Sequence, residues 1–194
     1  IFARYVSYVV ANLKDDCEHF ATMNEPMVYA SLGWIKGMWP PFVRLPGLHR
    51  LQEVTVSGVE EMANPDVTWR AIPRYLAVVK HLKRAHKRAY RVAKQVAPQS
   101  QVGLVKHIVV FGHTGGLRNR ARAWLCNYYW TYWFMNGVHR ECDTIGINYY
   151  HSVTYGSDNV HEKTDMGWDM RPAGIYHALV LLARYKKPLY VTEA

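Results

Sequence analysis

The sequence predicts an α/β fold in which helices cover a parallel sheet. Short apolar runs alternate with amphipathic stretches along the chain, and segments rich in glycine, proline and polar residues separate them. Apolar strands that alternate with helices are typical of parallel sheets buried on both faces. The chain has 194 residues, 49% hydrophobic and 20% charged, so it is long enough to enclose one sizeable core.

Four helices are predicted, most of them from apolar residues that recur at a spacing of three and four. The first covers residues 1–14. The clearest covers 72–96, where one apolar stripe faces inward and lysines and arginines fill the other faces. The third covers 121–136 and ends at Gly137, and the fourth covers 172–185 and begins at a proline, which suits a first helical turn.

Four strands are predicted from short, largely apolar runs between these helices, over residues 17–23, 102–110, 144–150 and 189–192. Pro26 cannot donate to a sheet, so the first strand is expected to end near Glu25. Residues 33–66, 112–120 and 151–167 are predicted to be loops. A connection as long as the first of these is often functional. The predicted order is therefore α-β-α-β-α-β-α-β.

Two glutamates follow predicted strands and carry the chemistry of the sequence. Glu25 ends the run Thr22-Met23-Asn24-Glu25 before a proline, and Glu193 ends Val191-Thr192-Glu193. In sheets of β/α barrels the carboxyl ends of the strands hold the active site. A pair of carboxylates is what hydrolysis of a glycosidic bond requires.

Three motifs in this order carry a resemblance to a known family. They are Thr-x-Asn-Glu-Pro at 22–26, Gly-x-Asn-Tyr-Tyr at 146–150 and Val-Thr-Glu at 191–193, and the segment Thr164-Asp165-Met166-Gly167-Trp168 precedes the last of them. Together they resemble the retaining β-glycosidases of glycoside hydrolase family 1. The resemblance covers essentially the whole chain, most loosely over 42–65 and 111–139. It implies a (β/α)8 TIM barrel, here a partial barrel of about four βα units that matches strands four to seven, with 1–194 forming a single, partial catalytic domain.

The resemblance also implies a role for each site residue. Glu25 matches the acid/base and Glu193 the nucleophile. Asn24 matches the contact to the sugar 2-hydroxyl, Tyr150 matches the tyrosine that holds the nucleophile, and Asn148 is expected to support the same site. The implied reaction is hydrolysis of terminal β-D-glucosidic or β-galactosidic bonds with retention, through a glycosyl-enzyme intermediate, without a metal or an organic cofactor.

The expected proton logic follows from these roles. A hydroxyl donated by Tyr150 would favour the ionised form of Glu193. The negative charge on Glu193 would in turn raise the pKa of Glu25 and keep it protonated until the ester forms.

A second hypothesis is that the chain is an inactive, truncated barrel that acts as a carbohydrate-binding or assembly module. The rest of the barrel is expected from a longer enzyme of which this chain is a fragment, from a complementary chain, or from a second copy in a homo-oligomer. Open edge strands near Glu25 and Glu193 would otherwise invite association.

Charge and cysteine content narrow the partners and the location. The net charge is +9, but much of it lies on 70–94 as the solvated face of a helix, so a glycoside or oligosaccharide rather than a nucleic acid is the expected partner. The three cysteines are widely spaced and odd in number, which favours a reducing cytoplasm. Since no apolar run approaches the ~20 residues of a membrane span, no membrane partner is expected.

Overall fold

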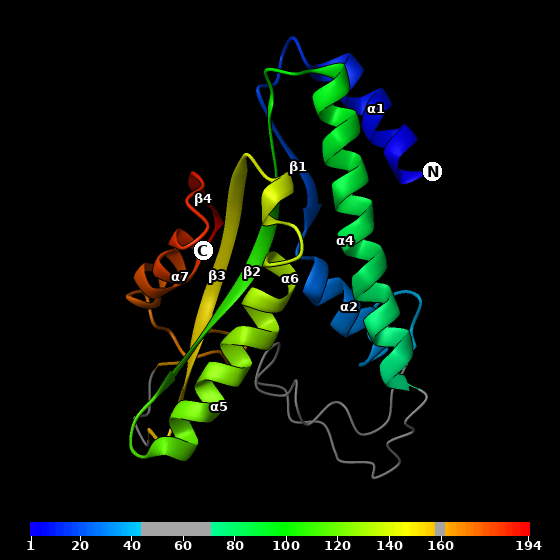
Figure 1. The fold of residues 1–194 in the computed structure, drawn as a ribbon. Coiled ribbons are helices and arrows are strands. Elements are labelled where there is room, and N and C mark those ends of the chain that lie inside the picture. The colour runs from blue at the N-terminus through cyan, green and yellow to red at the C-terminus, as the bar shows by residue number, and fades with distance from the viewer. Residues whose placement is uncertain (44–70, 158–161) are drawn as a thin grey trace.

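Four strands lie side by side in one parallel sheet that curls into half of a barrel (Figure 1). The computed structural model describes residues 1–43, 71–157 and 162–194. Within these ranges the strands are β1 (His19–Asn24), β2 (Gln101–His113), β3 (Thr144–Tyr155) and β4 (Leu189–Glu193). They pair in the order β1-β2-β3-β4, and each pairing is parallel. The predicted α/β class with a parallel sheet is therefore confirmed.

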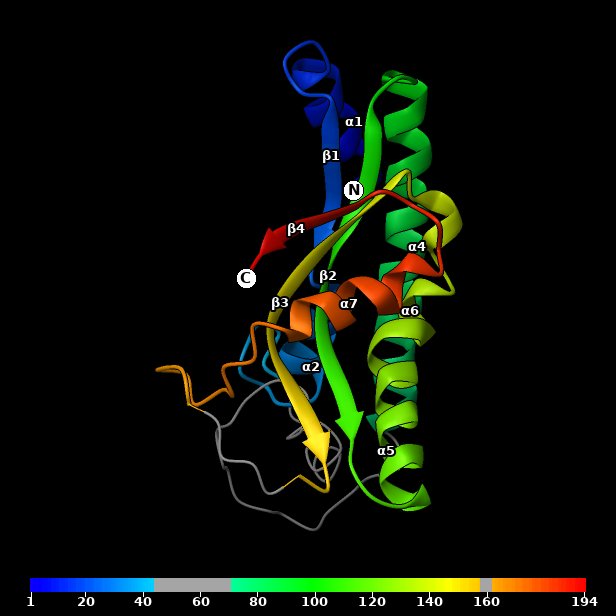
Figure 2. The same ribbon diagram turned by 90° about the vertical axis from the view of Figure 1, so that its left-hand side faces the viewer.

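The helices lie along the outer side of the curled sheet (Figure 2). They are α1 (Phe2–Leu13), α2 (Pro26–Trp34), α4 (Ala71–Val96), α5 (Leu117–Asn127), α6 (Trp133–Met135) and α7 (Gly174–Ala183). A π-helical segment over Tyr128–Tyr132 joins α5 to α6, and a 3-10 turn covers His139–Glu141. All four predicted helices are present, and the third one is divided among α5, the π-helical segment and α6.

The predicted loops differ most from the structure. The short helix α2 was not predicted, because Pro26 suggested only the end of a strand; a proline is equally suited to the first turn of a helix, where its missing N–H is not needed. Strands β2 and β3 also run beyond their predicted ends, because their distal halves pair with each other from Val110 with Ser152 to His113 with Tyr155. Such pairing between distant segments is not visible in local polarity. Residues 44–66 and 158–161 of the predicted loops lie outside the described residues.

The core lies between the sheet and its helices. On β3, the residues Ile145, Ile147 and Tyr149 are buried in a cluster that also includes Phe134 of α6 and Leu182 of α7. A smaller cluster joins α1, α4 and the start of β2, through Val6, Val10, Ala89, Ala93 and Val102. Burial of these side chains removes apolar surface from water, so the two clusters hold the strands and hence the ends of the strands in place.

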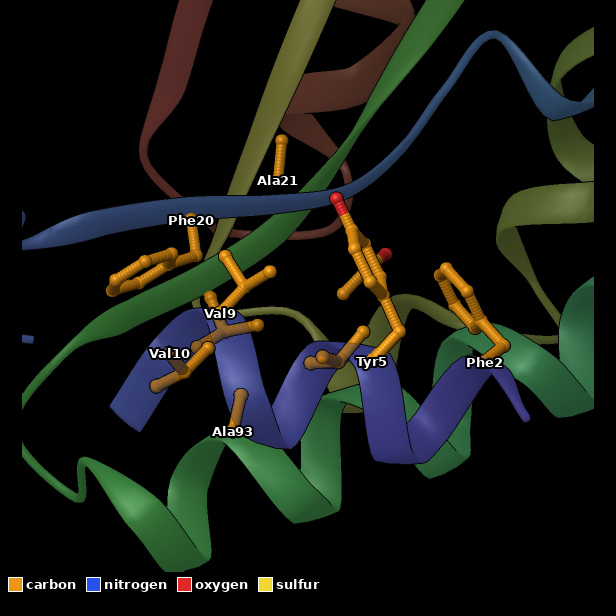
Figure 3. A pocket seen from close by; sticks show the side chains of 10 residues that line it. Phe2, Tyr5, Val9, Val10, Phe20, Ala21 and Ala93 are labelled. Atoms are coloured by element: carbon orange, nitrogen blue, oxygen red, sulfur yellow. The ribbon is translucent and has the colours of Figure 1, made fainter. Parts of the chain in front are cut away.

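An apolar cavity of about 150 Å³ lies between α1, α4 and the outer strand β1 (Figure 3). Phe20 and Ala21 of β1 form one side of it, and Phe2, Val9 and Val10 of α1 form another. Its lining contains no carboxylate, so it lacks the groups that glycoside hydrolysis requires. In the described ranges, no helix is both long enough and apolar enough to cross a membrane.

Candidate active site

Three strands change register close to the residues that the sequence analysis singled out. Between Ala21 and Asn24, β1 advances by three residues while β2 advances by two. Between Val191 and Glu193, β4 advances by two residues while β3 advances by one. Between Tyr149 and Ser152, β3 advances by three residues while β2 advances by two. Bulges of this kind re-aim side chains and are common next to active sites.

Glu25 lies at the junction of β1 and α2, in a backbone conformation that non-glycine residues seldom adopt. Its φ is 46° and its ψ is 56°, which is the left-handed region. Two constraints hold it there: its N–H donates to the carbonyl of Val105 on β2 at 2.9 Å, and Pro26 directly begins the helix. Residues held in such conformations cluster at functional sites.

Asn148 joins the three motifs. It is fully buried on β3, and its Nδ2 donates to Oε1 of Glu25 at 2.8 Å and to Oδ1 of Asn24 at 3.2 Å. Its Oδ1 accepts the hydroxyl of Thr192 on β4 at 2.6 Å. One amide therefore connects the Asn-Glu motif of β1 to the Thr-Glu motif of β4, two segments that are far apart in the sequence.

Glu193 lies at the exposed end of β4, where it is the register partner of Asn148 on β3. The hydroxyl of Tyr150 donates to Oε2 of Glu193. Burial, then this hydrogen bond and the charges of Glu25 and Glu193, raise the pKa of Tyr150, so the phenol stays protonated and remains a donor. The structure thus brings all five predicted site residues together: Asn24, Glu25, Asn148, Tyr150 and Glu193.

The pKa of Glu25 is raised above its ordinary value. Partial burial is the main cause, and the negative charge of Glu193 acts in the same direction. The hydrogen bond from Asn148 and the positive charge of Lys106 act against it. Because burial dominates, Glu25 holds its proton to higher pH than a solvated carboxyl does, which is what a general acid needs.

Lys106 of β2 is a charged residue near the site that the motif analysis missed. It is fully buried, its Nζ donates to the carbonyl of His107 at 2.7 Å, and it lies 4.7 Å from the centre of the Trp130 ring. Burial lowers its pKa to about 7, although the charge of Glu25 opposes this shift. The signal in the sequence is a single lysine within an otherwise apolar buried strand, since such residues are rarely buried without a partner.

His86 supports the site from behind β1. It is fully buried on α4, and its Nε2 donates to the carbonyl of Glu141 at 2.7 Å. Burial lowers its pKa to about 4, so the ring is neutral and Nδ1 accepts the hydroxyl of Thr22 at 2.7 Å. Thr22 is the first residue of the Thr-x-Asn-Glu-Pro motif. In the described residues no cluster of histidine, cysteine and carboxylate side chains has the arrangement of a metal site.

Comparison with known proteins identifies the family of the chain. A family model described as glycosyl hydrolase family 1 matches residues 1–111. The chain is 24% identical over 235 residues to beta-glucosidase A of Thermotoga maritima, covering 99% of this chain and 47% of the relative. It is 23% identical over 252 residues to a beta-galactosidase of Pyrococcus woesei, covering 99% of this chain and 45% of the relative.

Solved structures show the same fold. The crystal structure of a hyperthermophilic beta-glucosidase from Pyrococcus furiosus superposes with a TM-score of 0.75 at 21% identity, covering 98% of this chain and 40% of that one. The half-barrel is therefore part of a (β/α)8 barrel fold. The chain spans about half the length of the curated relatives it matches.

Proposed function

The chain belongs to glycosyl hydrolase family 1, and from this premise we propose that Glu25 and Glu193 are the two catalytic carboxylates of a β-glycosidase. The proposed reaction is hydrolysis of a terminal β-linked glucose or galactose with retention, through a covalent glycosyl-enzyme intermediate. The names of the relatives, a beta-glucosidase and a beta-galactosidase, support the choice of a β-linked hexose.

The observation that carries the proposal is the placement of the two carboxyls along one face of β3. Asn148 holds Glu25 and Tyr150 holds Glu193, and these two β3 residues are separated by a single position. Side chains two residues apart on a strand point to the same side. Both glutamates are therefore anchored at the carboxyl end of the sheet. This suits a reaction that attacks a sugar with one carboxyl and protonates its leaving group with the other.

The environments suit different protonation states. Glu25 is partly buried and has a raised pKa, whereas Glu193 is exposed and accepts the hydroxyl of Tyr150. In the first step Glu25 gives its proton to the leaving oxygen while Glu193 attacks the anomeric carbon. The resulting ester has no charge on Glu193, so the pKa of Glu25 falls and the group can accept a proton from the attacking water. Asn24, held beside Glu25 by Asn148, is positioned to meet a sugar hydroxyl.

Four strands provide only part of the walls of a sugar site. We assign the remaining walls to further strands that would pair with the outer sides of β1 and β4. These strands would come from the same polypeptide, from a complementary chain or from a second copy. Residues 1–194 are then a single, partial catalytic domain. The three cysteines are unpaired, which suits a reducing compartment, and a cytoplasmic location is part of the proposal.

The test is to trap the intermediate in the full-length protein with activated 2-fluoro-glucosides and 2-fluoro-galactosides and to measure the intact mass. One glycosyl adduct is expected, and peptide mapping should place it on Glu193. Glu193→Gln should form none. Glu25→Gln should still form the adduct, because an activated leaving group needs no proton, but should lose turnover of substrates with poor leaving groups.

Glu18→Gln is the matched control, since Glu18 is an exposed carboxylate just before β1. It should label and turn over like the unmodified protein. If the unmodified protein forms no adduct, or forms it on another residue, the catalytic assignment is wrong. Saturable sugar binding without any adduct would favour the alternative of a carbohydrate-binding module.

A further inference from the structure

Two consecutive residues of β3 share the same aromatic neighbours. Tyr150 lies 5.5 Å from the ring of His107 and 5.6 Å from that of Trp168, and His151 lies 6.1 Å and 5.2 Å from the same two rings. Along a regular strand, successive side chains point to opposite faces. The additional residue in β3 between Tyr149 and Ser152 removes this alternation and brings both rings to one side.

The four rings form a closed circuit drawn from three segments. His107 comes from β2, Tyr150 and His151 from β3, and Trp168 from the segment before α7. Trp130 adds a perpendicular contact to His107 at 5.7 Å, and its Nε1 donates to the His107 carbonyl at 3.1 Å. His107 is therefore held at its ring and at its backbone, and it in turn contacts the Tyr150 ring.

The two histidines of the circuit are buried and uncharged, whereas Tyr150 and Trp168 are half-buried. His107 and His151 are 5% and 6% exposed. Burial lowers the pKa of His151 to about 4 and holds the pKa of His107 well below its ordinary value. Nδ1 of each histidine and Nε1 of Trp168 have no hydrogen-bond partner in the part of the chain that the structure describes. These three side chains thus contribute contact area to the circuit rather than hydrogen bonds.

We propose that His107 and His151, together with Trp168, are positioning residues that hold the Tyr150 ring so that its hydroxyl donates to Glu193. The inference rests on the proposed function, because Glu193 is the nucleophile in that proposal. Tyr150 reaches Glu193 through the last atom of its side chain. A small rotation of the ring would displace the hydroxyl, and the contacts of the Tyr150 ring with His107 and Trp168 restrict that rotation.

The experiment compares His107→Ala and His107→Phe with Tyr150→Phe in the full-length protein. Loss of a hydrogen bond to a charged group costs about 10- to 100-fold in kcat, which is the decrease expected for Tyr150→Phe. His107→Ala should lower kcat in the same direction with little change in KM. His107→Phe keeps a ring in contact with Tyr150 and should retain most of the activity. In the double variant His107→Ala/Tyr150→Phe, the loss should not exceed that of Tyr150→Phe alone.

A second readout does not require turnover. The carboxyl carbon of Glu193 can be observed at fixed pH by carbon-13 NMR after labelling glutamate, with Glu193→Gln to assign the signal. Tyr150→Phe should displace this signal, because the carboxylate loses a hydrogen-bond donor. His107→Ala should displace the signal in the same direction. If the alanine variant does not fold, Trp168→Leu, which removes the second ring in contact with Tyr150, should give the same displacement.

His139→Ala is the matched control, because His139 forms an equivalent pair with Tyr185, 5.0 Å apart, outside the site. It should alter neither kcat nor the carbon-13 signal of Glu193. Additive losses in the double variant, or an unchanged Glu193 signal in both His107→Ala and Trp168→Leu, would overturn the positioning role. An unmodified protein that forms no glycosyl adduct would overturn the proposed function instead, and the NMR signal would still decide whether the rings hold Tyr150.

Discussion

At the scale of single residues, Asn148 has the largest number of connections to the proposed chemistry. Its amide donates to Glu25 and Asn24 and accepts from Thr192, so three strands meet at one buried side chain. Removing such a buried amide costs more free energy of folding than its hydrogen bonds contribute, because the groups left behind are buried without partners.

Asn148→Ala tests this connection. The hydrogen bond from Asn148 lowers the pKa of Glu25, so its removal should raise that pKa further. Since Glu25 acts first as an acid, the basic limb of the pH profile of kcat/KM should move to higher pH, and the maximum should fall at least about tenfold. Asn12→Ala, which removes an exposed asparagine of α1, should change neither. If the basic limb of the profile does not move, the hydrogen bond from Asn148 does not influence the pKa of Glu25.

His86 gives a prediction about stability and pH. Its pKa is about 4 in the folded protein against 6.5 for a free imidazole, so the unfolded chain binds the proton more tightly. The contribution of the neutral His86 ring to the free energy of unfolding is complete above pH 6.5. It is lost as the pH falls toward 4, and the loss is about 3 kcal/mol at the lower limit. His151 has a pKa displaced in the same direction and adds to the loss.

His86→Gln should therefore flatten the dependence of the unfolding free energy on pH between 6.5 and 4, as measured by urea unfolding at several pH values. It should also lower stability at pH 7, because the contacts to Thr22 and Glu141 are disturbed. His177→Gln is the control, since His177 is exposed. A pH dependence unchanged by His86→Gln would show that the ring is not held neutral in the fold.

At the scale of elements, the start of α7 depends on a glycine. A Cβ at Gly174 would lie 1.7 Å from the hydroxyl oxygen of Tyr149 and 2.5 Å from Oγ of Ser152. Tyr149 cannot easily move away, because its ring is buried and its hydroxyl donates to the carbonyl of Arg171 at 2.7 Å. The glycine thus allows α7 to pack directly on β3.

Gly174→Ala should consequently destabilise the protein by about 1–3 kcal/mol, as expected for an overpacked core. Thermal or urea unfolding measures this. Gly116→Ala provides the comparison, because a Cβ at the start of α5 meets nothing within 4 Å and the φ of Gly116 is −69°. If both variants were equally stable, the close approach of α7 to β3 would be wrong.

At the scale of the whole molecule, the curl of the sheet brings its two outer strands into contact. His19 of β1 and Tyr190 of β4 have ring centres 5.4 Å apart, and Nε2 and the hydroxyl are separated by 3.1 Å. Strands at opposite edges of a four-stranded sheet can meet only across its concave side. Within the residues that the structure describes, β1 and β4 nevertheless each pair with one strand only, so their outer sides can take a further strand. Tyr190 and Val191 of β4 are each 45% exposed.

Hydrogen exchange measured on the full-length protein tests whether further strands close the barrel. Amides of β4 that do not donate to β3 should exchange as slowly as those in the centre of β2 and β3, because a neighbouring strand would bind them. The amides of Gly115 and Gly116, in the exposed turn between β2 and α5, serve as the fast reference. Fast exchange along the outer side of β4 would contradict closure at that edge.

The sequence by itself determined the α/β class, the order of the four strands and the four predicted helices, and the strand ends at which the two glutamates lie, but not helix α2. These features depend on local patterns: apolar runs, helical spacing, and a proline after Glu25. Only the tertiary structure decided that Asn148 joins Glu25 to Thr192, that Lys106 is buried nearby, and that His107 and His151 share one side with Tyr150. Those relations depend on register and bulges between segments up to 123 residues apart. Register is set by pairing across the sheet, which local periodicity does not encode.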